Sequence, residues 1–145
     1  MARVINLRDP GKLRHRARRT IAEILRRLTS KPTLDVEARD MAATVVFCLR
    51  DIAKTIEVTT TAWERRNYYL KADRFRLQWE WVTPTAENLC DLIIKERWKH
   101  LPGELAELAS HFSDIRVARM TRDASTWQGN YQRLLAQKDE PAQEP

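Results

Sequence analysis

The sequence is poor in the residues from which turns and disulfide frameworks are made. Its 145 residues include three glycines, six prolines and two cysteines. Glycine and proline are the main turn formers, so the connections should be few and short. No stretch alternates apolar and polar residues with β-branched enrichment, which argues against strands. We therefore predict an all-α fold, an antiparallel four-helix bundle with an additional C-terminal helix.

The two cysteines, Cys48 and Cys90, lie inside apolar helical patterns. They form no CxxC pair and have no histidine at metal-ligand spacing, so we expect small core residues in a reducing compartment. The amino terminus lacks the apolar run of a signal peptide, and no run approaches the roughly 18 apolar residues of a membrane span. The sequence thus predicts a cytoplasmic protein with no membrane partner.

Catalytic and metal-binding patterns are also missing. The histidines, His15, His100 and His111, are scattered. No pair has the spacing of a zinc motif, and no Glu-x-x-His occurs for a di-iron site in a helical bundle. Three glycines cannot build a phosphate-binding loop, a nucleophile elbow or a dinucleotide fingerprint. We predict a protein that is not an enzyme, with no metal and no cofactor.

What the chain has in excess is positive charge. The formal net charge is +6 and the sequence pI is about 9.7. A basic balance favours polyanionic partners, nucleic acid first. The first thirty residues hold nine Lys/Arg against Asp9 and Glu23, so the excess is concentrated in the first helix. Either these cations merely solvate an amphipathic helix, or they face a polyanion.

Apolar periodicity places the helices. Asp9-Pro10 is typical of a helix start, and Ser30-Lys31-Pro32-Thr33 of a break. The expected helices cover about 10–29, about thirty residues ending near 63, 70–94, 102–112, and a last helix after Asp123. Pro84 should kink the third helix unless Thr83 recaps it. The predicted single domain is 1–137, with a frayed tail at 138–145.

Two short patterns stay ambiguous. Arg116, Arg119 and Arg122 recur every third residue, which would align them on one side of a helical turn. The stretch 62–81 places three tryptophans and two tyrosines among five cations. Phe75 and Trp79 share a helix face there, which indicates a buried aromatic stripe flanked by solvated charges. The alternative is a surface where guanidinium groups bind phosphates and exposed rings stack on unpaired bases.

The order of these segments resembles the accessory variability determinant (Avd) proteins of diversity-generating retroelements. A basic first helix, the Ser-Lys-Pro-Thr connection and a long second helix ending near Trp63 are followed by Arg65-Arg66. After four residues come Lys71-Ala72-Asp73, a basic-aromatic third helix and a Leu-rich fourth helix. The matched pieces are 19–33, 51–63, 71–76 and 101–112. The chain departs from the family in its longer C-terminus and its tryptophan-rich third helix.

The resemblance implies a basic, barrel-like homopentamer that supplies no catalysis. Such proteins bind a reverse transcriptase and its structured template RNA during mutagenic, adenine-targeted cDNA synthesis. The expected partners are therefore RNA or an RNA–DNA hybrid, a reverse transcriptase and further copies of the chain. Alternatives are a small helical subunit of an RNA-guided (CRISPR-type) effector complex, a protein-only helical adaptor, or a plain structural bundle.

Charge and helix phase, rather than the family, select the candidate nucleic-acid-binding residues. Phosphate contacts are expected from cations of the first three helices. These are Arg14, Arg18, Arg19, Arg26, Arg65, Arg66, Lys71 and Arg74. Base stacking is expected from Tyr68, Tyr69 and Trp81.

Overall fold

The computed structural model describes residues 8–138, and this part of the chain contains helices and no strand. The predicted all-α class is confirmed. The α-helices are α1 (Pro10–Ser30), α2 (Val36–Arg65), α3 (Tyr69–Trp79), α4 (Val82–Ile94), α5 (Leu101–Ala109) and α6 (Asn130–Lys138). Short 3-10 turns are η1 (Trp98–His100), η2 (Ser110–Phe112) and η3 (Ala124–Thr126).

Helix α1 begins where the sequence predicts. The Asp9 carboxylate accepts a hydrogen bond from the backbone N–H of Lys12 at 3.1 Å, and Pro10 occupies the first turn. Both features stabilise a helix start, since the first N–H groups have no partner inside the helix. The buried side of α1 includes Ile21, Ile24 and Leu25.

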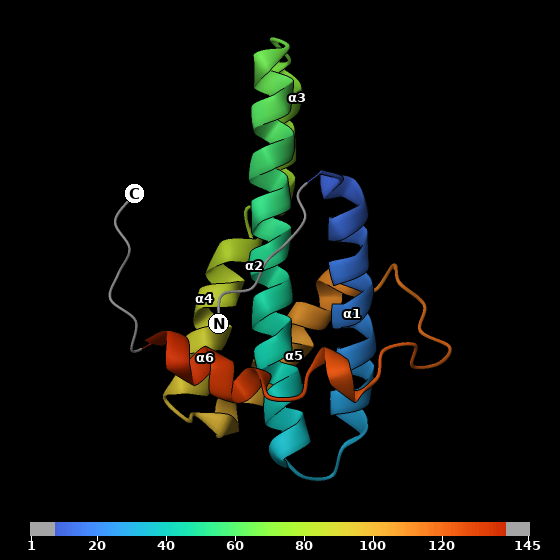
Figure 1. Ribbon diagram of the computed structural model, residues 1–145, viewed down its shortest axis with the longest axis vertical. Helices are drawn as coiled ribbons and strands as arrows, with labels where there is room; N and C mark the ends of the chain where they lie inside the picture. Colours follow the sequence, from blue (N-terminus) through green and yellow to red (C-terminus); the bar gives the residue numbers. More distant parts are fainter. Residues whose placement is uncertain (1–7, 139–145) are drawn as a thin grey trace.

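Helix α2 lies at the centre of the fold (Figure 1) and packs against α1, α3, α4 and α6. The Asp35 carboxylate caps its first turn by accepting from the backbone N–H of Ala38 at 2.8 Å. Every residue from Met41 to Leu49 is buried, because neighbouring helices cover this part of α2 on all sides. A helix that is apolar all round is expected only in such a position.

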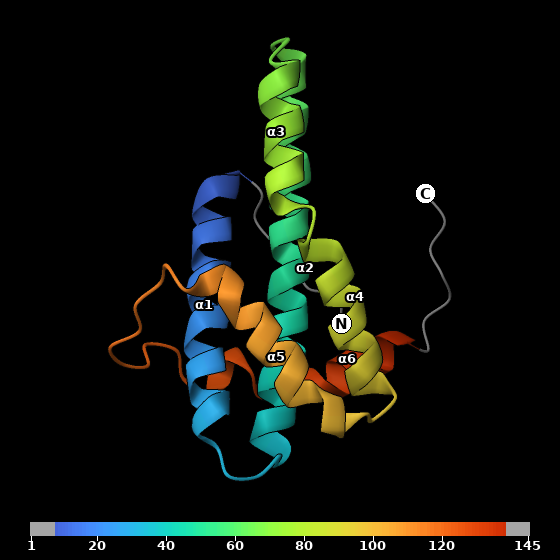
Figure 2. The ribbon, with the colours of Figure 1, turned by 180° about the vertical axis from the view of Figure 1, so that it is seen from behind.

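The turn between α2 and α3 reverses the chain at Asn67, which has a φ of 65°. The left-handed conformation closes α2, with the backbone N–H of Asn67 donating to Glu64 and that of Tyr68 to Trp63. Asparagine tolerates this conformation better than most residues. The antiparallel pair formed by the end of α2 and by α3 projects beyond the start of α1 (Figures 1 and 2).

The helix expected at 70–94 is interrupted, as Pro84 indicated, and the structure divides it into α3 and α4. The interruption lies at Glu80 and Trp81, ahead of Pro84. Proline has no N–H to complete the helical hydrogen bond four residues back, so it is tolerated only in the first turn of a new helix. Thr83 does not recap α4, because Trp81 occupies the cap position and no side-chain bond caps it.

The C-terminal part also differs from the prediction. The segment 113–123, hereafter the arginine loop, is not helical, so Arg116, Arg119 and Arg122 do not share a helical turn. Asp123 caps η3 rather than a long last helix. Helix α6 begins only at Asn130, where Asp40 of α2 accepts from the backbone N–H groups of Gly129 and Tyr131 at 3.1 and 3.0 Å.

The described residues pack around one continuous apolar core that takes side chains from all the α-helices except α3. The predicted tail at 138–145 starts at Lys138, which is the last residue of α6. Residues 139–145, like residues 1–7 of the predicted domain, lie outside the described residues.

Candidate nucleic-acid interface

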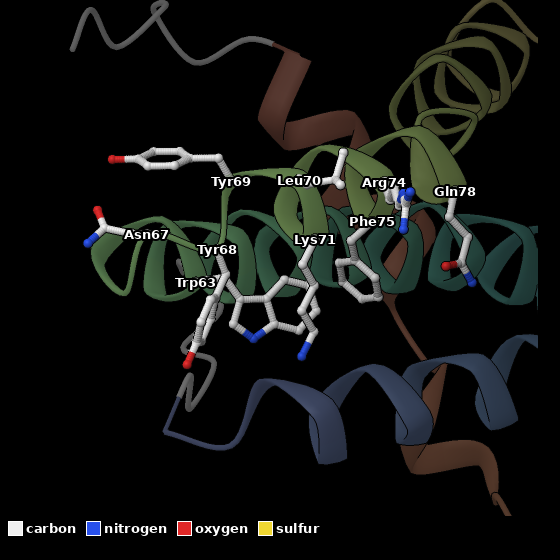
Figure 3. A pocket seen from close by; sticks show the side chains of 9 residues that line it. All are labelled: Trp63, Asn67, Tyr68, Tyr69, Leu70, Lys71, Arg74, Phe75 and Gln78. Atoms are coloured by element: carbon white, nitrogen blue, oxygen red, sulfur yellow. The ribbon is translucent and has the colours of Figure 1, made fainter.

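The projecting end of the α2–α3 pair carries an open groove of about 730 Å³. Residues from the end of α2, the turn and one side of α3 line it (Figure 3). The lining residues are Trp63, Asn67, Tyr68, Tyr69, Leu70, Lys71, Arg74, Phe75 and Gln78. We call this feature the tip groove. It holds four of the candidate residues, namely Lys71, Arg74, Tyr68 and Tyr69.

The wall of the tip groove consists of aromatic rings that contact one another and a lysine. Trp63 and Phe75 meet edge to face with ring centroids 5.0 Å apart, and the Lys71 ammonium lies 4.4 Å from the Trp63 ring centroid. Both arrangements follow the electrostatics of an aromatic ring, which has a negative face and a positive edge. The rings are half-buried, so one surface of the pair stays open to a ligand.

Two tyrosines form the exposed part of the tip. Tyr68 is 52% exposed and Tyr69 56% exposed, which is high for side chains of this size. In Figure 3, Trp63, Tyr68, Lys71 and Phe75 extend toward the side of the hairpin on which α1 begins. Tyr69 extends from the turn in another direction. The tip therefore presents exposed rings on two sides, and each of them could stack on an unpaired base.

The cations of the tip outnumber its carboxylates. Residues 64–76 contain five Lys/Arg but only Glu64 and Asp73 as acids. Both acids are engaged by Arg76, which donates to Glu64 at 2.6 Å and to Asp73 at 3.4 Å. The Arg76 hydrogen bond lowers the pKa of the Glu64 carboxyl. Of the remaining cations, Arg65, Arg66 and Arg74 are exposed and make no ion pair with a described carboxylate.

The four candidates on α1 are engaged by the protein itself. The Arg14 guanidinium donates to Thr55 Oγ1 at 3.2 Å and lies 4.9 Å from the Phe75 ring centroid. Burial lowers the pKa of Arg14. Arg14 therefore connects the core to the base of the tip groove, and its guanidinium is only partly available to a ligand.

Arg18 is held more completely. Its guanidinium donates to both carboxylate oxygens of Asp114, at 3.1 and 2.7 Å, and to the backbone oxygen of His111 at 3.3 Å. It also lies 5.5 Å from the Phe112 ring centroid. The hydrogen bond from Arg18 lowers the pKa of Asp114. In this arrangement Arg18 fastens α1 to the end of η2.

Arg19 and Arg26 fasten the arginine loop to α1. Arg19 donates to Glu23 at 2.8 Å and to the backbone oxygen of Arg116 at 3.0 Å, and Arg26 donates to the backbone oxygen of Val117. The physical reason is local: a loop without helical hydrogen bonds leaves its carbonyl oxygens to be satisfied by side chains. In the described conformation the guanidinium groups of Arg18 and Arg19 are half-buried and held by these contacts, whereas Arg26 uses one nitrogen for Val117 and its side chain stays exposed.

Glu23 is the centre of this attachment. The carboxylate is fully buried, and it accepts from Thr121 Oγ1 at 2.6 Å, from the backbone N–H groups of Thr121 and Arg122, and from Arg19. Burial alone raises the pKa of Glu23, but these hydrogen bonds outweigh it and lower the pKa to about 2. Sequence reasoning missed this role, because Glu23 looked like one acid in a basic helix.

Trp81 does not have the free ring face expected of a stacking residue. The His111 ring covers it with centroids 3.7 Å apart and planes 7° from parallel, and Phe112 meets its edge at 5.9 Å. The half-buried Trp79 is a third neighbour, with ring centroids 6.2 Å apart. Trp81 is a packing residue between α4 and η2. The aromatic residue that takes its place near the cations is Trp63, which the sequence assigned to the end of a helix.

Comparisons of the chain with protein-family models, curated proteins and solved structures found no match. Within residues 8–138, no helix is both long enough and apolar enough to cross a membrane. The same residues contain no group of three or more His, Cys, Asp or Glu side chains placed to hold a metal ion.

Proposed function

We propose that the protein is a non-catalytic nucleic-acid-binding accessory protein that holds an unpaired stretch of RNA at the tip groove. The observation that carries the proposal is the coincidence of exposed rings and unpaired cations on one projecting hairpin. Tyr68 and Tyr69 are about half exposed, and Lys71 and Arg74 line the same groove. Single-stranded nucleic acid is bound by this combination of stacking and phosphate contacts.

The chemistry of each side chain determines which part of the nucleic acid it would contact. Tyr68, Tyr69 and the open side of Trp63 supply ring surfaces, each worth about 1–3 kcal/mol per stacked base. Lys71, Arg74, Arg65 and Arg66 supply phosphate contacts, which position the strand without reading its sequence. Recognition at the tip would therefore tolerate many sequences and depend strongly on salt.

The proposal extends to the architecture and the assembly. We interpret α1, α2, α3 with α4, and α5 as a four-helix bundle to which α6 is added. The resemblance to Avd proteins is one reason to propose that a reverse transcriptase and its template RNA, or the RNA–DNA hybrid made from it, are the partners. The projecting hairpin would then deliver an unpaired template segment, and copies of the chain would assemble into a homo-oligomer, a pentamer if Avd-like.

A second candidate is the protein-only adaptor, because two leucines on α3 are uncovered. Leu70 and Leu77 are each 64% exposed and lie seven residues apart, which places them on one helix face. Such a stripe is typical of helix-to-helix docking. The stripe shares Leu70 with the tip groove, and Arg74 lies between the two leucines on the same helix face. Docking through the leucines alone predicts protein binding that salt barely weakens.

The experiment compares variants in their affinity for a fluorescent uridine 12-mer over a range of salt concentrations. Removing Lys71 and Arg74 (both to Gln) should lower the affinity about tenfold and reduce the log–log salt slope by about 1.4, two contacts at about 0.7 each. Changing Tyr68 and Tyr69 to Ala should lower the affinity about tenfold or more and leave the slope unchanged, since stacking releases no counterions.

The matched control is the double variant Arg97→Gln, Lys99→Gln, which removes the same charge from the exposed connection between α4 and α5. It should change the affinity less than about twofold, since the connection between α4 and α5 lies at the end of the molecule opposite the tip (Figure 1). An equal loss in control and tip variants would reduce the binding to net charge. Wild-type protein that leaves the 12-mer unbound at low salt would refute the proposed function.

A further inference from the structure

The positive charge of this protein is concentrated on a second surface, which α1 and the arginine loop form. Residues 8–30 and 113–123 together hold eleven Lys/Arg and four Asp/Glu. The rest of the chain has fifteen Lys/Arg and sixteen Asp/Glu, so the whole excess of +6 lies on α1 and the arginine loop. In Figures 1 and 2 this loop lies beside α1 and away from α4 and α6.

The acids of this surface are already engaged. Glu23 is buried beneath the loop, where Arg19 and Arg122 contact it at 2.8 and 3.4 Å. Asp114 is paired with Arg18 at 2.7 Å. The remaining two acids, Asp9 and Asp123, accept from backbone N–H groups as caps. The exposed side chains of Arg16, Arg116 and Arg119 therefore make no ion pair with a described carboxylate.

The arginine loop and α1 form one surface, because four hydrogen bonds of the loop backbone, besides the side-chain contacts, hold the loop on the helix. Its backbone accepts from Arg19 at Arg116 and from Arg26 at Val117, and it donates to Glu23 at Thr121 and Arg122. The loop thereby holds the backbone of Arg116 next to α1, and the exposed Arg119 lies between the attachment points at Val117 and Thr121. Along α1, Lys12 and Arg26 lie on the same side and fourteen residues apart, which is about 21 Å.

The side chains of this surface suit phosphate groups better than a membrane, a protein partner or unpaired bases. None of the exposed large apolar residues among residues 8–138 belongs to α1 or to the arginine loop, although a membrane-surface helix or a protein-docking surface would need them. Its one exposed ring is the imidazole of His15, and neither α1 nor the arginine loop contains a Phe, Tyr or Trp on which an unpaired base could stack. Guanidinium groups bind phosphate in pairs of parallel hydrogen bonds, and a span of about 20 Å covers several phosphates of a duplex.

We propose that α1 and the arginine loop form a second nucleic-acid site that binds the phosphate backbone of a duplex through Lys12, Arg16, Arg26, Arg116 and Arg119. The site is distinct from the tip groove in position and in the form of nucleic acid that it takes. With both sites occupied, the protein binds the paired stem of a structured RNA at α1 and the arginine loop, and an unpaired segment of the same RNA at the tip groove. The duplex site stands even if the tip groove binds something else.

The test uses a variant with Arg16, Arg116 and Arg119 changed to Gln and a matched control with Arg97, Lys99 and Lys138 changed to Gln. All six side chains are exposed, and both variants lose three charges. The probes are a blunt 18-base-pair RNA duplex, a DNA duplex of the same length and the uridine 12-mer. Loss of three contacts should weaken duplex binding about tenfold or more and lower the log–log slope by about 2–3, at about 0.9 per contact.

The control variant should bind both duplexes within about twofold of wild type, and the loop variant should bind the uridine 12-mer within about twofold. Equal losses in the two variants, or a loop variant with full duplex affinity, would overturn the proposal. So would wild-type binding to vesicles of phosphatidylserine and phosphatidylcholine without duplex binding, which would assign the surface to a membrane. Conversely, a tip variant that keeps duplex binding and loses the 12-mer would show that the two sites are separate.

Discussion

Arg18 and Asp114 are ninety-six positions apart in the sequence, and the guanidinium of one donates to the carboxylate of the other at 2.7 Å. Both carboxylate oxygens accept from it. The same guanidinium lies beside the rings of Trp79 and Phe112, at 5.9 and 5.5 Å from their centroids. An arginine that the helix pattern places at the edge of a basic face is thus part of the packing between α1, α3 and η2.

Replacing Arg18 with Ala should therefore lower the free energy of unfolding by about 1–2 kcal/mol, through loss of its hydrogen bonds and of its packing on the rings. Arg16→Ala is the matched change on the same helix and should cost less than about 0.5 kcal/mol, because that side chain is exposed. Urea denaturation followed by circular dichroism measures both. Equal stabilities would mean that the Arg18–Asp114 pair does not persist in solution.

Glu23 should make stability depend on pH in the acid range. Its pKa in the fold is about 2, against an ordinary value of 4.5. Since the folded pKa is the lower one, Glu23 stabilises the protein above pH 4.5, and this contribution of roughly 3 kcal/mol is lost as the pH falls toward 2. Wild type should exceed Glu23→Gln in stability by a margin that shrinks over this range.

Urea unfolding at several pH values between 6 and 2 checks this, with Glu107→Gln at an exposed position of α5 as the control. Glu107→Gln should follow the wild-type curve. A constant gap between wild type and Glu23→Gln at all pH values would contradict a carboxylate that is held ionised by the arginine loop.

Asp40 should decide whether α6 stays attached. Its carboxylate accepts from the backbone N–H groups of Gly129 and Tyr131, and Asn130 donates to Thr44 Oγ1 at 2.7 Å beside it. Asp40→Ala leaves two backbone donors without their acceptor, at a cost of about 1–3 kcal/mol. Hydrogen exchange should accelerate in residues 127–138 and remain slow in the core of α2; uniform acceleration would show global destabilisation instead.

The aromatic residues of α2 and α3 should differ in their effect on stability. Trp79 lies between Phe75 and Trp81, at 6.1 and 6.2 Å, so Trp79→Ala should cost about 2–4 kcal/mol. Trp63 borders the open tip groove, so Trp63→Ala should cost about 1–2 kcal/mol and weaken binding of the uridine 12-mer. A larger stability loss at Trp63 than at Trp79 would contradict this arrangement.

The sequence predicted helix boundaries well where capping residues and prolines mark both the start and the end of a helix. Asp9 with Pro10 marks the start of α1, and the predicted break at Pro32 and Thr33 lies between α1 and α2 in the structure. The α3–α4 boundary was harder, because Pro84 indicates a disturbed helix without fixing where the helix restarts. Helix α6 is capped by Asp40, whose partners lie about ninety residues away, so no local pattern could place its first residue.

The candidate site was predictable only where its residues are close together in the sequence. Tyr68, Tyr69, Lys71 and Arg74 are neighbours in sequence, and one turn of chain brings them to one groove. The α1 arginines are different, because their partners are in the arginine loop and η2, and contacts over such separations are invisible to helix phase. The role of Arg116 and Arg119 likewise depends on the attachment of the loop to Glu23.

Ultraviolet crosslinking of the uridine 12-mer, followed by trypsin digestion and mass spectrometry, tests the central claim most directly. Trypsin cuts after Arg66 and Lys71, so both exposed tyrosines fall in the single peptide 67–71. Bases stacked on these rings should crosslink predominantly to that peptide, and the Tyr68→Ala, Tyr69→Ala variant should lose the product. Crosslinks confined to peptides outside residues 63–78 would contradict nucleic-acid binding at the tip groove.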